Sequence, residues 1–204
     1  MARMGLQTWL SIMRNCSWVP TAFPNAHSEG FDQNRDCRSD RDRRYNCIAW
    51  ALGKTHQFWW PRNVWGYHWP RGLPREPLNQ ETVRNFIAAF ETEGYVRCWS
   101  RRFSRKYEKI ALYVNPEGRP KHAARLFRAG TWTSKLGNGE DIEHKTLRCL
   151  EGDTYGKAKF FFKRRLLECE RNGPLTRFRS FLSRIFAKRQ RGFSPIPKES
   201  PTAN

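Results

Sequence analysis

Cys47 is the residue of this chain best suited to act as a nucleophile. It follows Asn46 in the run YNCIAWALG (residues 45–53), and an asparagine side chain caps a helix well because it accepts hydrogen bonds from first-turn amides. The cysteine is therefore expected at the first helical position, with Gly53 ending the helix. The partial positive charge of a helix N-terminus favours a thiolate, which predicts a reactive sulfur at neutral pH. The alternative is a small apolar side chain buried in a core helix, which is where most free cysteines lie.

His122, far downstream in the sequence, supplies the base that a thiol nucleophile needs. The segment PKHAARLF (residues 120–127) alternates with a period of two and predicts a strand in which His122, Ala124 and Leu126 share one face. A histidine at a strand end, beside small residues that leave room for a ligand, can take the proton of a cysteine across a cleft. The alternative is a structural histidine with no part in chemistry.

The remaining patterns predict an α+β domain in which helices precede an antiparallel sheet of about five strands. Besides the helix over residues 46–53, an apolar stripe predicts a helix from Asn79, its cap, to Gly94. A short helix is expected over about 143–151, with His144 at its start. Short connections that contain Gly or Pro favour antiparallel neighbours. The strands are expected at about 95–99, 108–114, 121–128, 131–136 and 157–163.

An aromatic loop follows the candidate nucleophile helix. Trp59, Trp60 and Trp65 are suited to line a substrate subsite, because aromatic side chains make good walls for a ligand cleft. Packing of a long loop against the core explains them equally well. Interleaved with Arg62 and Arg71, the same tryptophans are also suited to stack on the bases of a single-stranded nucleic acid.

Seven short motifs follow one another in the chain. They are YNCIAWALG (45–53), WWP (59–61), WPRGLPRE (69–76), EKIALY (108–113), HAARLF (122–127), WTSKLG (132–137) and DIEH (141–144). This series resembles an uncharacterised family of mostly bacterial single-domain proteins, known as a domain of unknown function. The resemblance covers about residues 40–165.

The order of the elements is more remotely similar to the papain-like superfamily, in particular to NlpC-type peptidases and amidases. In that pattern a cysteine-bearing helix precedes an antiparallel sheet, and a histidine opens a middle strand. The resemblance implies that Cys47 is the nucleophile, that His122 is its base, and that a polar residue on the following strand orients the imidazole. That strand lacks the Asn, Asp, Gln or His usual there, and Ser134 is the residue we assign to the position. The other candidates are Thr133, Asp141 and His144. The implied activity is hydrolysis of an amide or related acyl bond in a peptide or protein.

The formal net charge of +19 indicates attraction to polyanions. Residues 171–204 hold eight Lys or Arg against one acidic residue, so much of the charge lies near the C-terminus. A second hypothesis is therefore a non-catalytic basic module that binds nucleic acid or an acidic partner on the same scaffold.

The composition along the chain predicts four regions. Residues 1–44 are expected to form an irregular arm, and residues 45–165 the papain-like α+β domain. Residues 166–192 have the pattern of a basic amphipathic helix, which is suited to bind anionic lipid, a partner's groove or the domain's own core. Residues 193–204 are expected to be a disordered tail.

The six cysteines are spread along the chain without C-x-x-C spacing, which disfavours a disulfide framework and predicts reduced thiols. Cys and His spacings give no zinc signature, and we expect neither a metal nor another cofactor. No apolar run approaches the length of a membrane span, and the first residues are too polar for a secretory signal. These features predict a cytoplasmic protein.

Overall fold

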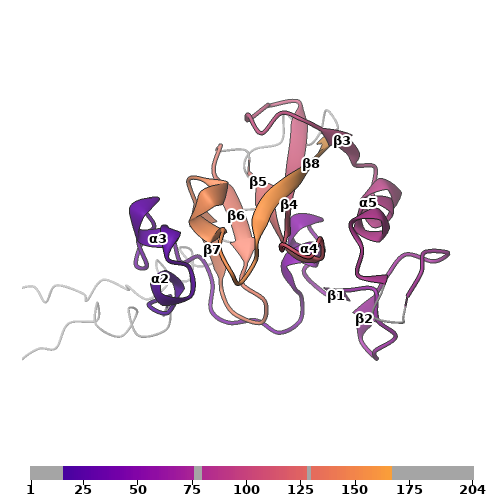
Figure 1. Ribbon diagram of the computed structural model, residues 1–204, viewed down its shortest axis with the longest axis horizontal. Helices are drawn as coiled ribbons and strands as arrows, with labels where there is room; N and C mark the ends of the chain where they lie inside the picture. The colour runs from indigo at the N-terminus through magenta and orange to yellow at the C-terminus, as the bar shows by residue number, and fades with distance from the viewer. Residues whose placement is uncertain (1–15, 76–79, 128–129, 167–204) are drawn as a thin grey trace, which may run out of the picture. The chain divides into compact units, whose positions relative to one another are not determined.

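The structure is a computed structural model that describes residues 16–166, apart from 76–79 and 128–129 (Figure 1). The predicted basic helix and the predicted tail, from residue 167 onwards, lie outside the described residues. Among the residues described, no helix is both long enough and apolar enough to cross a membrane.

A six-stranded antiparallel sheet forms the centre of the described chain. Its order is β3-β8-β4-β5-β6-β7. The strands are β3 (Val96–Cys98), β4 (Tyr107–Val114), β5 (Pro120–Leu126), β6 (Trp132–Lys135), β7 (Asp141–His144) and β8 (Lys157–Arg165). The α+β class and the antiparallel pairing are confirmed, and five of the strands lie where the sequence predicts them.

Strand β7 is the strand of the six-stranded sheet that the sequence does not predict. A helix is expected from about residue 143, but the short helix in this region is the 3-10 helix η2 (Leu147–Leu150), and His144 is the last residue of β7. Ile142 is fully buried and pairs with Ser134 of β6 on one side. On its other side it forms an isolated bridge with Cys37. Tertiary pairing on both sides therefore makes this segment extended.

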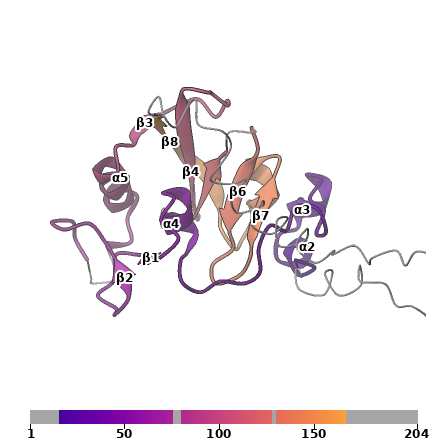
Figure 2. The same ribbon diagram turned by 180° about the vertical axis from the view of Figure 1, so that it is seen from behind.

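The two longer helices pack on one face of the sheet. Helix α4 (Cys47–Ala51) lies against β5, and α5 (Val83–Thr92) lies beside β3 (Figures 1 and 2). The cap of α5 is Thr82, whose hydroxyl accepts from the backbone amide of Asn85 at 3.2 Å, and the predicted cap Asn79 lies outside the described residues. A small parallel pair, β1 (Phe58–Trp59) with β2 (Tyr67–His68), follows α4.

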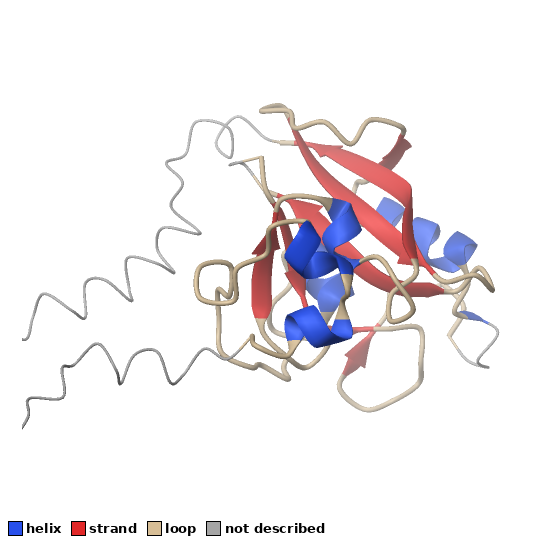
Figure 3. Ribbon diagram, turned by 60° about the vertical axis from the view of Figure 1, so that its left-hand side comes forward, coloured by secondary structure: helices blue, strands red, loops and turns tan. Residues whose placement is uncertain are grey.

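Residues 16–37 form two short helices instead of the irregular arm that the sequence predicts. They are α2 (Val19–Ala22) and α3 (Asn25–Ser28), which lie at the β7 end of the sheet in Figure 1 and come to the front in the turned view of Figure 3. A disulfide joins Cys16 to Cys37, so the expectation of reduced thiols is wrong for this pair. The two cysteines are buried in one apolar cluster, a proximity that their separation in sequence does not reveal.

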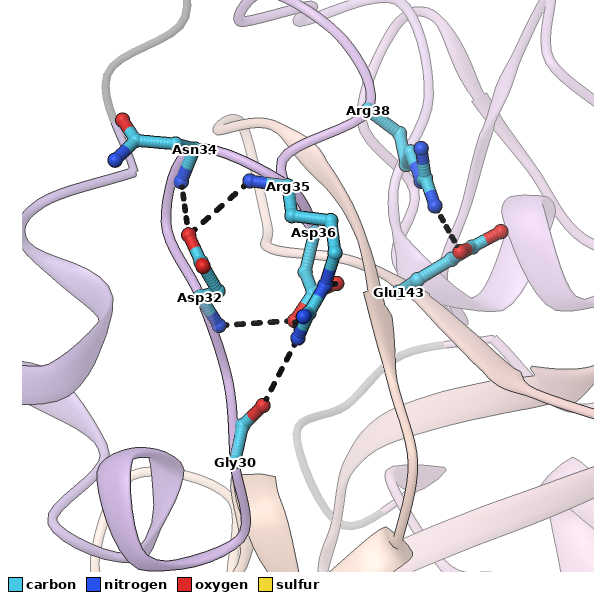
Figure 4. A network of polar contacts seen from close by, with 7 residues as sticks. All are labelled: Gly30, Asp32, Asn34, Arg35, Asp36, Arg38 and Glu143. Carbon is cyan, nitrogen blue, oxygen red and sulfur yellow. Dashed lines mark hydrogen bonds and ion pairs between the residues drawn. The ribbon is translucent and has the colours of Figure 1, made fainter.

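Residues 36–38 continue the sheet beyond β7. The amide of Arg38 donates to the carbonyl of Asp141 at 2.7 Å, and the amide of Glu143 donates to the carbonyl of Asp36 at 2.8 Å. The side chains of Arg38 and Glu143 also form an ion pair (Figure 4). Within the preceding turn the side chains of two aspartates accept backbone amides, as Figure 4 shows for Asp32 and Asp36.

Each face of the sheet carries its own apolar core. The first core lies under α4 and α5 and includes Ile48, Phe86, Phe90, Ile110, Leu112, Ala123 and Phe162. The second core lies under the N-terminal helices and includes Val19, Phe23, Tyr113, Ala124, Leu126, Ile142 and Leu150. Burial of apolar side chains on both faces fixes the register of the central strands, because a slip of one residue would exchange the two sets.

Candidate functional site

Cys47 is the first residue of α4, as the sequence predicts. The side chain of Asn46 accepts from the backbone amide of Ala49 at 3.1 Å and so caps the helix. The same asparagine donates to the carbonyl of Trp59 at 2.8 Å, which ties the helix start to β1. Local sequence therefore determines the placement of the sulfur at a helix tip.

The Cys47 thiol is buried and neutral in this structure. Burial raises its pKa to about 11, although the backbone amides of Ala123, Ile48 and Cys47 itself lower the pKa in part. The cost of moving a thiolate out of water thus exceeds the gain from the helix N-terminus. The expectation of a thiolate at neutral pH is wrong for the described state.

His122 lies on β5 and takes part in a hydrogen-bonded series of three buried side chains, which we call the histidine–serine relay (His122, Ser134 and His144). The Nε2 atom of His122 is 3.0 Å from the Ser134 hydroxyl, and this hydroxyl is 2.9 Å from Nε2 of His144. Nδ1 of His144 is 2.7 Å from the carbonyl oxygen of Thr146. All three side chains come from adjacent strands, β5, β6 and β7.

The bonds of the relay determine which ring nitrogens carry hydrogen. Since the carbonyl of Thr146 can only accept, Nδ1 of His144 is the protonated nitrogen. Burial lowers the pKa of His144 to about 4, so this ring is neutral and its Nε2 accepts from Ser134. The Ser134 oxygen then accepts from Nε2 of His122. Burial, and to a lesser extent His144, lowers the pKa of His122 well below its ordinary value, so Nδ1 of His122 carries a lone pair.

That Nδ1 atom of His122 is buried and has no hydrogen-bond partner among the described residues. A buried acceptor without a donor costs about 1–3 kcal/mol, so such atoms are uncommon in folded proteins. An imidazole with one nitrogen oriented by a hydroxyl and the other free is the form in which histidine accepts a proton.

Tyr155 links the histidine to the neighbourhood of the cysteine. Its ring stacks on the His122 ring, with centroids 4.0 Å apart and planes 7° apart. Burial raises the pKa of Tyr155, and the nearby Cys47 thiol raises it further. Phe23 of the N-terminal segment also packs on Tyr155, at 5.0 Å between centroids. No sequence pattern indicates a role for Tyr155, because it lies in the turn between residues 152 and 156.

Cys47 and His122 share Ala123 as a neighbour but are not hydrogen-bonded to each other. The sulfur lies near the Ala123 amide, one residue beyond His122. Cys47 and Ala123 belong to the core under α4, whereas the His122 ring contacts Tyr113 of the second core. Both side chains are buried, with 5% of Cys47 and 0% of His122 exposed.

The other candidates for the third position have different partners. The Thr133 hydroxyl accepts from Trp50 and donates to the carbonyl of Arg125. Asp141 accepts from the Tyr45 hydroxyl at 2.7 Å. Ser134 is therefore the polar side chain bonded to the imidazole of His122, and His144 joins it from the strand beyond.

The three tryptophans assigned to a substrate subsite have three different environments. Trp59 is buried in the core, and Trp60 is half-buried with its indole nitrogen donating to Glu81 at 2.9 Å. Trp65 is 99% exposed. Arg62, which the sequence places among them, forms an ion pair with the same Glu81. Packing thus accounts for Trp59 and Trp60, and Trp65 alone of the three presents its ring to solvent.

Residues 36–163 match the model of one family, described as a domain of unknown function (DUF7689). The match contains Cys47, Tyr155 and all three members of the histidine–serine relay. No curated protein and no solved structure matches the chain.

Proposed function

The chain belongs to the DUF7689 family of unknown function, and within that family we propose that it is a cysteine hydrolase that cleaves an amide or related acyl bond. In this proposal Cys47 is the nucleophile, His122 is the base, and Ser134 and His144 are positioning residues. The observation that carries the proposal is the free, buried Nδ1 of a histidine whose Nε2 is bonded to Ser134.

The arrangement of elements supports the same proposal. A cysteine at a helix tip, a histidine on a strand and a polar residue on the adjacent strand agree with the papain-like, NlpC-type resemblance. The fold assignment to that superfamily is part of the proposal, because fold alone does not fix function.

The proposed reaction requires the Cys47 thiol, which belongs to the core under α4, to come within reach of Nδ1 of His122, whose ring contacts the second core. The thiol proton then passes to Nδ1, which gives a thiolate and an imidazolium. The thiolate attacks the acyl carbon, and the backbone amide of Cys47 at the start of α4 donates to the oxyanion. The imidazolium gives its proton to the leaving amine, which departs and leaves an acyl thioester. Water, deprotonated by the same Nδ1, then attacks the thioester, releases the acid and restores the thiol.

The described arrangement is the resting state of this proposed enzyme. The buried pair is neutral there, because burial raises the pKa of Cys47 and lowers that of His122. Phe23 covers Tyr155, which in turn covers the His122 ring. Entry of a peptide or protein substrate therefore requires Phe23 and Tyr155 to separate. In this proposal the substrate then brings its polar groups to Cys47 and His122.

The test is covalent labelling with a peptide vinyl sulfone, followed by mass spectrometry of the modified cysteines. We expect label on Cys47, and a reduction of about 100-fold or more in its labelling rate in His122→Gln, the scale of general-base catalysis. Cys98→Ser is the matched control, because Cys98 is a more exposed free thiol on β3 and its removal leaves the rate at Cys47 unchanged.

Two results would contradict the proposal. One is labelling confined to Cys98, and the other is equal labelling of Cys47 in the wild type and His122→Gln. Because His122 is buried, circular dichroism checks that this variant is folded. Ser134→Ala retains the base but is also expected to destabilise the fold, so it is checked by circular dichroism in the same way. A changed pH profile of labelling in the folded variant reports loss of orientation of His122.

A further inference from the structure

A second surface, distant in the sheet order from the histidine–serine relay, combines exposed aromatic rings with cations. It consists of β3, the connection over residues 99–106, and β8, and we call it the basic edge. Trp99 is 91% exposed, Val96 is 54% exposed and Phe103 is 41% exposed. Exposed apolar side chains that are clustered and rimmed by polar residues, unlike single scattered ones, mark interaction sites.

The basic edge carries positive charge without intervening acids. Residues 96–107 and 157–165 contain ten Lys or Arg and no Asp or Glu. They are Arg97, Arg101, Arg102, Arg105, Lys106, Lys157, Lys159, Lys163, Arg164 and Arg165. The carboxylate of Glu108 at the start of β4 is buried and bonded to Arg125 and Arg164, so it neutralises Arg164 but not the other nine cations.

Several of these cations lie against aromatic rings. The guanidinium of Arg97 is 5.9 Å from the centroid of the Trp99 ring and 5.3 Å from that of Phe160. Arg101 lies 5.2 Å from the Phe161 ring, and Lys163 lies 5.0 Å from the Tyr107 ring. Phe160 packs against the first core and Phe161 against the second, so these contacts hold cations beside rings on both faces of the sheet along this edge.

We propose that the basic edge binds single-stranded nucleic acid, with Trp99 as a stacking platform for a base and the neighbouring cations on the phosphates. Exposed rings interleaved with Lys and Arg are the features by which proteins hold single strands, because each base offers a π-face and each linkage a negative charge. A duplex hides its base faces, so it would engage the charges but not Trp99. The proposal is independent of the hydrolase function.

Trp65 provides an internal comparison. It is as exposed as Trp99, at 99%, but Arg62, three residues before it in the sequence, is paired with Glu81. Trp65 therefore lacks the cations that a nucleic-acid site needs for the phosphates.

The test is fluorescence anisotropy of a labelled thymidine oligonucleotide of about 12 nucleotides, within the site sizes of known single-strand binders, titrated with the full chain. We expect Trp99→Ala to weaken binding about 10-fold, the scale of removing one base stack. Trp65→Ala is the matched control and leaves the affinity unchanged. The double variant Arg97→Gln/Arg101→Gln should make the fall of log affinity with log salt concentration less steep by about 1.4. This is about 0.7 for each phosphate that is no longer neutralised.

The proposal is overturned if Trp99→Ala and Trp65→Ala bind the oligonucleotide equally, because the ring then plays no part. It is also overturned if a duplex of the same length or heparin binds as tightly as the single strand, since charge alone would explain the affinity. Binding that depends only on residues 171–204 would place the polyanion site outside the basic edge and would also overturn the proposal. Tighter binding to phosphatidylserine vesicles than to the oligonucleotide would overturn it as well, because the preferred ligand would then be anionic lipid.

Discussion

The histidine–serine relay and the basic edge belong to one sheet but hold their polar groups in opposite states. The relay side chains are at most 2% exposed, and burial keeps both imidazoles neutral. The basic edge exposes the ring of Trp99 and most of its cations, and only Lys163 and Arg164 among the ten are half-buried. The difference follows from what covers each end of the sheet.

At the β7 end, residues 36–38 pair along the outer strand and the N-terminal helices cover one face. At the other end, β3 is three residues long, and no strand of the described chain pairs with its outer side. A short outer strand that carries arginine resists edge-to-edge aggregation, so its charge protects the fold as well as offering a binding surface. The same sheet therefore separates a neutral interior site from a charged exterior one.

The largest effect on stability is expected from breaking the relay at its centre. Ser134→Ala leaves Nε2 of both His122 and His144 without a partner in a buried site, at about 1–3 kcal/mol for each. We expect a decrease of about 3 kcal/mol in the free energy of unfolding, measured by urea denaturation. The control is Ser104→Ala in the basic edge, where the hydroxyl accepts an exposed amide and the expected decrease is below about 1 kcal/mol. Equal decreases in the two variants would remove the contrast between the regions.

A pH titration of stability sharpens the same contrast. The pKa of His144 is about 4 in the folded chain and 6.5 as its ordinary value, so the unfolded chain binds more protons between these limits. The stabilisation is fully present above pH 6.5 and is lost as the pH falls towards 4, by up to about 3 kcal/mol. His144→Gln should flatten this slope in urea denaturation, whereas Ser104→Ala in the basic edge, which removes no titratable group, should leave it unchanged. An unchanged slope in His144→Gln would show that another group titrates.

The smallest effect is expected at the basic edge itself. Arg101→Ala removes an exposed cation from the face of Phe161 and should cost at most about 1 kcal/mol. Urea denaturation at low salt is the measurement. A larger decrease in stability would mean that Arg101 supports the fold, and would weaken its use as a probe of binding.

Local patterns were sufficient where short-range forces determine the structure. The cap at Asn46 and the start of α4 depend on a few consecutive residues, and β5 follows from alternation in PKHAARLF. The sequence analysis assigns Ser134 through a resemblance. Its hydrogen bond to His122 depends on how the strands pair in space, which residue spacing alone does not reveal.

Features that depend on residues distant in sequence were not predictable in this way. Strand β7 has four residues, two of them acidic, and it is extended because Ser134 and Cys37 pair with Ile142 from both sides. The neutral thiol of Cys47 depends on burial by other elements, which outweighs the local effect of the helix tip. Tyr155 lies in a turn, where no periodic pattern indicates a stacking partner for His122.

The bond between Cys16 and Cys37 makes part of this architecture dependent on chemical surroundings. Glutathione and thioredoxin keep such bonds open inside most cells, whereas secreted and periplasmic proteins retain them. The bond spans the segment that carries Phe23, and Phe23 rests on Tyr155 above the imidazole of His122. Reduction would break the bond that joins the two ends of that segment. How firmly Phe23 is held over Tyr155 therefore depends on the redox potential of the compartment in which the protein works.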